Sequence, residues 1–77
     1  MNPDEIEKLI LQGMPSASVE VSGAEGKFVA EVVSEEFAGQ TPIKRHKLVY
    51  ACVNDHIVSG ALHALTIIAK TPDELKT

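Results

Sequence analysis

The chain has 77 residues, of which 44% are hydrophobic and 23% charged, and its formal net charge is −4. This length suffices for one domain over residues 1–77 and excludes a second folded unit, and the composition excludes a disordered chain. The negative charge opposes broad electrostatic capture of DNA, and three aromatic residues without tryptophan offer no stacking platform for single-stranded nucleic acid.

The N-terminal segment predicts a helix over residues 3–12. Asn2 is placed to cap this helix, Pro3 occupies its first position and Glu5 completes a capping-box pair. Gly13 provides the C-terminal stop.

Two alternating segments follow this helix. Apolar and polar residues alternate over 17–22 and again over 27–33, on either side of a glycine-bearing turn at 23–26. This pattern predicts two strands that form a hairpin.

A second helix is predicted to begin at Pro42, with Thr41 as its N-cap, and to end near Gly60. Its expected core-facing stripe is made of Leu48, Val49, Cys52, Val53 and Ile57.

The C-terminal segment predicts a third strand over 63–70, with apolar residues on both faces, which indicates a strand covered on both sides. The run 71–74 has the pattern of another capping box and predicts a last short helix.

The order helix, strand, strand, helix, strand, helical tail predicts an α+β fold. We expect a three-stranded sheet with helices on one face, and a right-handed crossover if the last two strands are parallel neighbours. This α-β-β-α-β-(α) order is also that of a type II KH-like fold, and a fold alone does not name a function.

The second helix opens with the basic turn Lys44, Arg45, His46 and Lys47. Three cations at the N-terminus of a helix oppose its macrodipole, so helix stability does not explain them. Such a run is either a solvated face or a binding site for an acidic or phosphate-bearing partner. For His46 itself we favour a structural role as a local hydrogen-bonding residue.

Several motifs occur in order along nearly the whole chain. They are Val21-Ser22-Gly23, Val32-Val33-Ser34, Phe37-Ala38-Gly39, Arg45-His46-Lys47-Leu48-Val49-Tyr50, Gly60-Ala61-Leu62-His63-Ala64-Leu65-Thr66-Ile67 and Thr71-Pro72-Asp73-Glu74. In these motifs the chain resembles the BolA family, specifically its small bacterial branch associated with acid stress. The aromatic residue usual in this family after the terminal Thr-Pro is Leu75 here.

The resemblance implies a partnership with monothiol glutaredoxins, in which a histidine of the BolA-like protein helps to coordinate a bridging 2Fe-2S cluster. His63 corresponds to that histidine, and neutral imidazole is a suitable iron ligand. The family often has a second ligand, His or Cys, in the loop between the first two strands, and the segment 23–27 contains neither. A shared cluster would then depend on His63 alone, on the carboxylate of Glu25 or on another residue brought near, and the chain alone is expected to hold no cofactor.

Two rival hypotheses remain open. The resemblance also implies a DNA-binding transcriptional regulator that places Lys44, Arg45 and Lys47 on phosphates or bases. The third hypothesis is a protein–protein module without a metal, which the lack of a His or Cys in the segment 23–27 supports. For His63 itself, the alternative to a ligand is a strand-end histidine bonded to a backbone carbonyl.

Other features predict no further chemistry. No nucleophile paired with a base and no carboxylate pair at catalytic spacing is visible, so we expect neither an enzyme nor a small-molecule substrate. We expect Cys52 to be a small buried hydrophobe and His56 to have a packing role. The single cysteine, the lack of an apolar run of 18 residues and the lack of a signal sequence favour the cytoplasm and no membrane.

Overall fold

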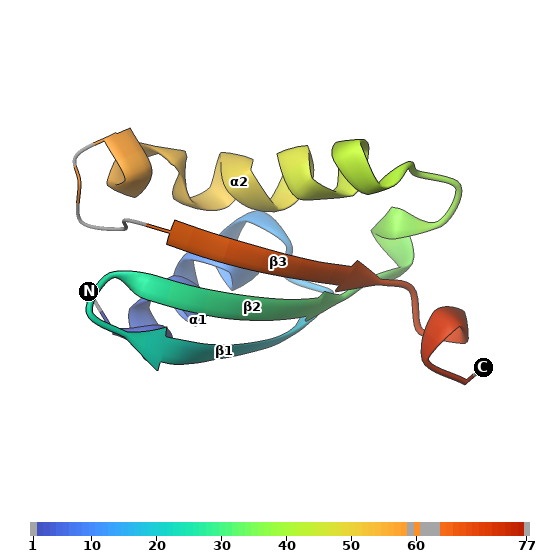
Figure 1. Ribbon diagram of the computed structural model, residues 1–77. Helices are drawn as coiled ribbons and strands as arrows, with labels where there is room; N and C mark the ends of the chain where they lie inside the picture. The colour runs from blue at the N-terminus through green and yellow to red at the C-terminus, as the bar shows by residue number, and fades with distance from the viewer. Residues whose placement is uncertain (1, 59, 61–63, 77) are drawn as a thin grey trace.

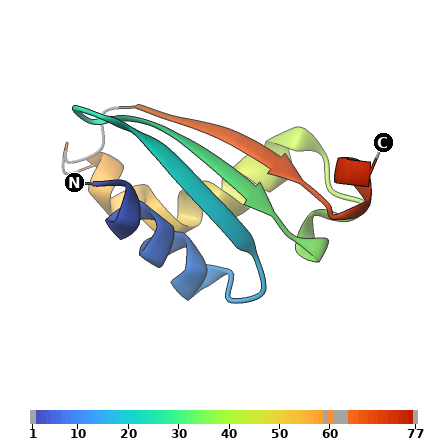
Figure 2. The same cartoon turned by 90° about the horizontal axis from the view of Figure 1, so that it is seen from below.

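The computed structural model describes residues 2–58, 60 and 64–76. In chain order the elements are α1 (Pro3–Gly13), β1 (Ser18–Ala24), β2 (Lys27–Val33), η1 (Glu35–Phe37), α2 (Pro42–Val58), β3 (Ala64–Lys70) and η2 (Asp73–Lys76), as Figure 1 shows. The sheet has the order β1-β2-β3, with β1 antiparallel to β2 and β2 parallel to β3. Both α-helices lie on one face of this sheet (Figure 2), which confirms the predicted α+β fold. The KH-like label stays a prediction with which this order is compatible.

The N-terminal helix begins as its cap predicts. The side chain of Asn2 accepts a hydrogen bond from the Glu5 backbone N–H (2.9 Å), and the Glu5 carboxylate accepts one from the Asn2 N–H (3.3 Å). Ile6 and Ile10, one turn apart, are fully buried against the sheet. At Gly13 an added Cβ would lie 2.5 Å from the Sγ of Cys52 in α2, so glycine permits the two helices to approach closely there.

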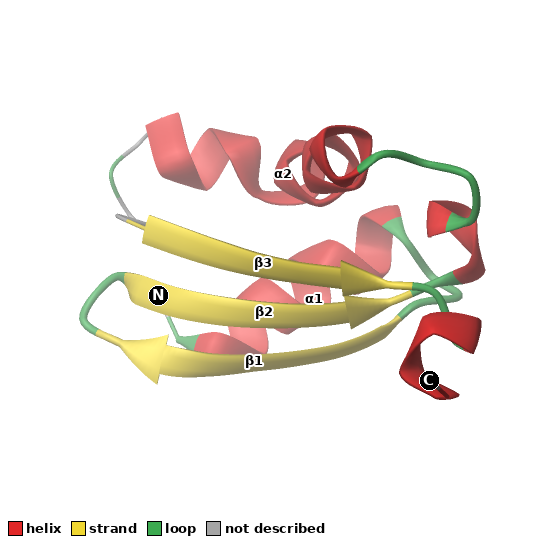
Figure 3. Ribbon diagram, turned by 45° about the vertical axis from the view of Figure 1, so that its right-hand side comes forward, coloured by secondary structure: helices red, strands yellow, loops and turns green. Residues whose placement is uncertain are grey.

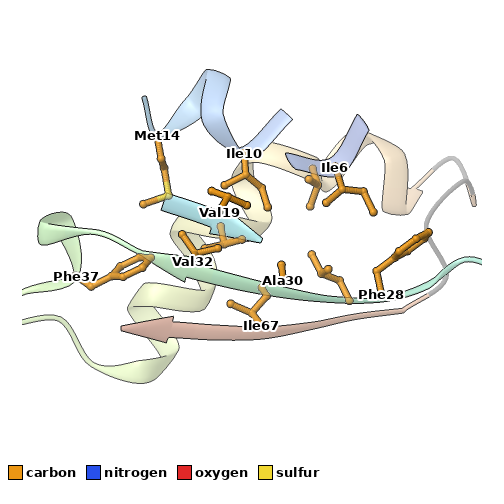
Figure 4. Packing of buried hydrophobic residues seen from close by; sticks show 12 residues of the cluster. Ile6, Ile10, Met14, Val19, Phe28, Ala30, Val32, Phe37 and Ile67 are labelled. Atoms are coloured by element: carbon orange, nitrogen blue, oxygen red, sulfur yellow. The ribbon is translucent and has the colours of Figure 1, made fainter. Parts of the chain in front are cut away.

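The inner face of the sheet supplies most of the remaining core. Phe28, Ala30 and Val32 of β2 are buried, as their alternation predicts. Side chains from α1 and from all three strands point toward one another in Figure 4. The buried hydrophobic cluster consists of Ile6, Ile10, Met14, Val19, Phe28, Ala30, Val32, Phe37, Val49, Val53, Leu65 and Ile67.

The outer face of β3 corrects one prediction. We expected this strand to be covered on both sides, but Ala64 and Thr66 are exposed and Ile68 is 39% exposed. The reason is that α1 and α2 pack on the same side, so within the described ranges no helix lies over the other face (Figure 3). His63, predicted as the first residue of this strand, lies outside the described residues.

The buried face of α2 is also rotated relative to the prediction. Val49 and Val53 are fully buried, but Leu48 is 39% exposed. Arg45 and Tyr50 turn toward β3, where the Tyr50 hydroxyl donates to the Leu65 carbonyl (3.1 Å). These contacts set the helix rotation, and Leu48 faces outward as a result.

The C-terminal capping box forms as predicted. The Thr71 N–H donates to the Glu74 carboxylate (2.7 Å), and the Glu74 N–H donates to the Thr71 hydroxyl (3.2 Å). The predicted last helix is a 3-10 turn of four residues, η2, which lies beyond the end of β3 (Figure 3).

Candidate functional site

The basic turn is fixed by the cap of α2. The hydroxyl of Thr41 accepts from the Lys44 N–H (3.3 Å), and the Thr41 carbonyl accepts from the Arg45 N–H (3.0 Å). The first turn so formed leaves Lys44 and Lys47 exposed, while Arg45 and His46 are half-buried. The four residues of the predicted site therefore face two different environments.

Arg45 is engaged inside the fold. Its guanidinium donates to the Gln40 carbonyl (2.9 Å), the Ala69 carbonyl (3.2 Å) and the Glu74 carboxylate (2.6 Å), and its side chain is only 13% exposed. It also lies 5.9 Å from the centre of the Phe37 ring. Arg45 thus ties the start of α2 to the end of β3 and to η2, a structural role that the sequence analysis did not predict.

The contact with Arg45 changes the pKa of Glu74 in η2. The hydrogen bond from Arg45, followed by the backbone bond from Thr71, lowers the pKa of the Glu74 carboxyl to about 2. The sequence indicates Glu74 only as part of a capping box. Its pairing with Arg45 across 29 positions has no local signal.

The two exposed lysines belong to a mixed surface on α2. We call the residues Ile43, Lys44, Lys47, Leu48 and Ala51 the α2 outer face, because all five are exposed and lie on adjoining turns. Ile43 is 69% exposed and Leu48 is 39% exposed. Cations beside exposed aliphatic side chains suit a protein partner that offers carboxylates around an apolar contact.

This geometry bears on the DNA hypothesis. Of the three cations placed on phosphates, Arg45 makes its hydrogen bonds within the fold, which leaves Lys44 and Lys47. Two phosphate contacts correspond to a shallow salt slope of about −2, a weak term for DNA binding.

The start of β3 lies against the β1–β2 turn. The Ala64 N–H donates to the Gly26 carbonyl (2.9 Å), and Lys27 is the register partner of Ala64. Glu25 is exposed in this turn, in the left-handed region with φ 57°. The residue that follows His63 is therefore adjacent to the turn in which the resemblance places a second ligand, at the left end of the sheet in Figure 1.

Two further side chains singled out in the sequence lie on α2. Cys52 is half-buried against the core, and burial, followed by the charge of Glu36, raises the pKa of its thiol. His56 is half-buried, as predicted. Within residues 2–58, 60 and 64–76, no three His, Cys, Asp or Glu side chains gather as a metal site, and no helix there is long and apolar enough to span a membrane.

Comparison with known proteins identifies close relatives of the chain. Residues 12–74 match the family model described as BolA-like protein. The chain is 40% identical over 74 residues to the "Uncharacterized protein in rpoN-murA intergenic region" of Acinetobacter guillouiae, covering 96% of this chain and 89% of that protein. It is 40% identical over 68 residues to the "UV-induced protein uvi31" of Schizosaccharomyces pombe, covering 87% of this chain but only 60% of that protein. The solved structure of a bolA protein homologue from Coxiella burnetii superposes with a TM-score of 0.88 at 33% identity, over 100% of this chain and 99% of that chain.

Proposed function

The chain belongs to the BolA-like protein family, and we propose that it is a cytoplasmic adaptor that docks on a monothiol glutaredoxin and shares that partner's 2Fe-2S cluster. In this role the protein catalyses no reaction and binds no small-molecule substrate. It contributes a ligand and a docking surface, and the glutaredoxin contributes thiolates.

One observation carries the proposal: the hydrogen bond of 2.9 Å between the Ala64 N–H and the Gly26 carbonyl. It brings the position after His63 next to the turn that carries Glu25. An imidazole and a carboxylate are both donors that iron accepts, so these residues fit the group. When bound, the cluster supplies one-electron chemistry, whose potential rises where histidine replaces cysteine.

The α2 outer face provides the docking surface in this proposal. Lys44 and Lys47 are exposed and make no ion pair with another described residue. Exposed cations of this kind steer an acidic partner and fix its orientation, while Leu48 offers the apolar contact. Half-buried His46 lies in the same turn.

The proposal extends to stress response. One relative bears the name "UV-induced protein", which describes that protein only. Because neutral imidazole coordinates iron and imidazolium does not, a histidine ligand would make the shared cluster sensitive to acidity.

The test mixes the purified protein anaerobically with a cluster-loaded monothiol glutaredoxin and records visible circular dichroism and size-exclusion profiles. We expect a heterodimer with a new cluster spectrum that His63→Ala abolishes and Glu25→Gln weakens. His56→Asn is the matched control and should keep the spectrum. A heterodimer without a spectral change would replace the proposal with metal-independent docking, and the absence of any complex would refute the adaptor role.

A further inference from the structure

The open face and the free edge of the sheet form a second surface, remote from the α2 outer face. The register places Glu20 of β1, Glu31 of β2 and Ile68 of β3 in one row across this open face. The next row toward η2 contains Ser18, Val33 and Lys70. β1 is the edge strand farthest from α2 in Figure 1.

The two edges of the sheet differ. On β3, the carbonyls of Leu65 and Ala69 accept hydrogen bonds from Tyr50 and Arg45 of α2, so this edge is capped by side chains. On β1, the described residues make backbone hydrogen bonds only with β2. Alternate residues of the seven in β1 therefore present unpaired N–H and C=O groups, which can receive an added strand.

Carboxylates gather beside this free edge. Glu20 and Glu31 are direct cross-strand partners, and together with Glu7 of α1 they line a hollow of about 300 Å³. No described ion pair includes any of the three. Because like charges directly opposite each other destabilise a sheet, the fold gains nothing from this placement.

A larger cleft of about 620 Å³ continues from this hollow and shares the three glutamates. Its apolar wall includes Leu11, Val33, Ile68 and Leu75. Leu75 belongs to η2 and is 58% exposed. η2 lies beside the open face in Figure 2. Lys70 lies on the β3 side, so the acidic character is confined to the half of the cleft nearer β1.

We propose that the β1 edge binds an extended segment of another protein that carries basic side chains at alternate positions. Its main chain pairs with β1, its cations lie on the open face against Glu20 and Glu31, and its intervening apolar side chains lie on the α1 side, where Leu11 lines the cleft. Strand addition of this kind takes affinity from main-chain hydrogen bonds and specificity from alternate side chains. A second copy of the chain is disfavoured as the occupant, because it would bring a like-charged edge against this one.

This inference goes beyond the proposed function, since it uses the edge of the sheet opposite the one that α2 caps. The probe is a fluorescein-labelled nine-residue peptide of alternating arginine and valine. Two controls are a peptide in which glutamate replaces arginine and one in which the same arginines and valines form two blocks. Binding is measured by fluorescence anisotropy, and the site is mapped by amide shifts and hydrogen exchange.

We expect the alternating basic peptide to bind and to protect amides of β1. The double variant Glu20→Gln with Glu31→Gln should weaken binding by about three- to tenfold, because each exposed ion pair contributes only a few-fold in affinity. Asp4→Asn with Asp55→Asn changes the net charge equally at two exposed positions outside the cleft and should leave binding unchanged. Circular dichroism verifies that both variants are folded.

Several results would overturn the inference. They are equal binding of the acidic peptide, equal binding of the block peptide, amide shifts confined to α2, and a dimer of the chain whose interface is β1. No binding of the alternating basic peptide at millimolar concentration would likewise reject it.

Discussion

Arg45→Ala is expected to destabilise the fold far more than its position in an exposed-looking basic run suggests. The substitution leaves the carbonyls of Gln40 and Ala69 without the Arg45 donor and removes one of the hydrogen-bond partners of Glu74. Hydrogen bonds to a charged group contribute about 1.5–3 kcal/mol each to stability. Because the Arg45 side chain is 13% exposed, water can bond some of the acceptors that it leaves and recover part of this energy. We therefore expect a loss of about 2–4 kcal/mol, a large share of the roughly 4–12 kcal/mol typical for this chain length.

The assay is urea unfolding followed by circular dichroism at 222 nm, with Lys44→Ala as the matched control. Lys44 is exposed, and its removal should change the unfolding free energy by less than about 0.5 kcal/mol. Arg45→Lys keeps the charge but not the planar fork of donors, so an intermediate loss is expected. Equal stability of Arg45→Ala and Lys44→Ala would refute the structural role of Arg45, and full stability of Arg45→Lys would show that charge alone matters.

Three further predictions concern other contacts. The pKa of Glu74 is depressed from 4.5 to about 2 in the folded state, so its contribution to stability is present above about pH 4.5 and is lost as the pH falls toward 2; in acid titrations of stability, Glu74→Gln should flatten this part of the curve, and an unchanged curve would contradict the pairing. Gly13→Ala should change the free energy of unfolding by less than about 1 kcal/mol, because the new methyl group would meet only the rotatable Sγ of Cys52, at 2.5 Å, and because alanine favours the helix over glycine by about 1 kcal/mol. A loss above about 2 kcal/mol that Cys52→Ala relieves would show that the Cys52 side chain cannot move aside. Lys44→Ala with Lys47→Ala should weaken glutaredoxin binding by about tenfold at low salt and leave urea stability unchanged, whereas unaltered affinity in calorimetry would remove the α2 outer face from the proposal.

Local signals in the sequence predicted local structure well. The Asn2–Glu5 and Thr71–Glu74 capping boxes form between residues three apart, so neighbouring side chains are sufficient to specify them. The strand predicted over 27–33 forms with those bounds, since its alternation has one buried face.

Which side chains of α2 and β3 are exposed depends on tertiary contacts, so local sequence patterns did not predict it. The exposed side chain of Leu48 follows from how α2 rotates against β3, and helical periodicity alone places residues 48 and 49 within one broad apolar stripe. One face of β3 is exposed because both helices pack on the other face of the sheet. The apolar residues of a single strand do not indicate on which face the helices pack.

The sequence also predicted the candidate site only in part. Lys44 and Lys47 are exposed, as a partner surface requires. Arg45 instead donates to acceptors 24 and 29 positions away, and no local sequence pattern indicates these contacts. His63 lies outside the described residues, so its role stays a prediction. The carboxylate pair of Glu20 and Glu31 was within reach of the sequence, because a hairpin turning at 25 and 26 makes them register partners.

The position of β2 in the middle of the sheet has a consequence for the order of folding. Its partner on one side, β1, is reached through a two-residue turn, whereas its partner on the other side, β3, pairs Ala64 with Lys27 only after the whole of α2 has been traversed. The closure entropy of the longer connection is the larger one, so the hairpin can assemble while the second side of β2 still has no neighbour. Before β3 pairs, the second side of the central strand is an open edge that another molecule could pair with, so docking of α2 and β3 also removes a site of aggregation.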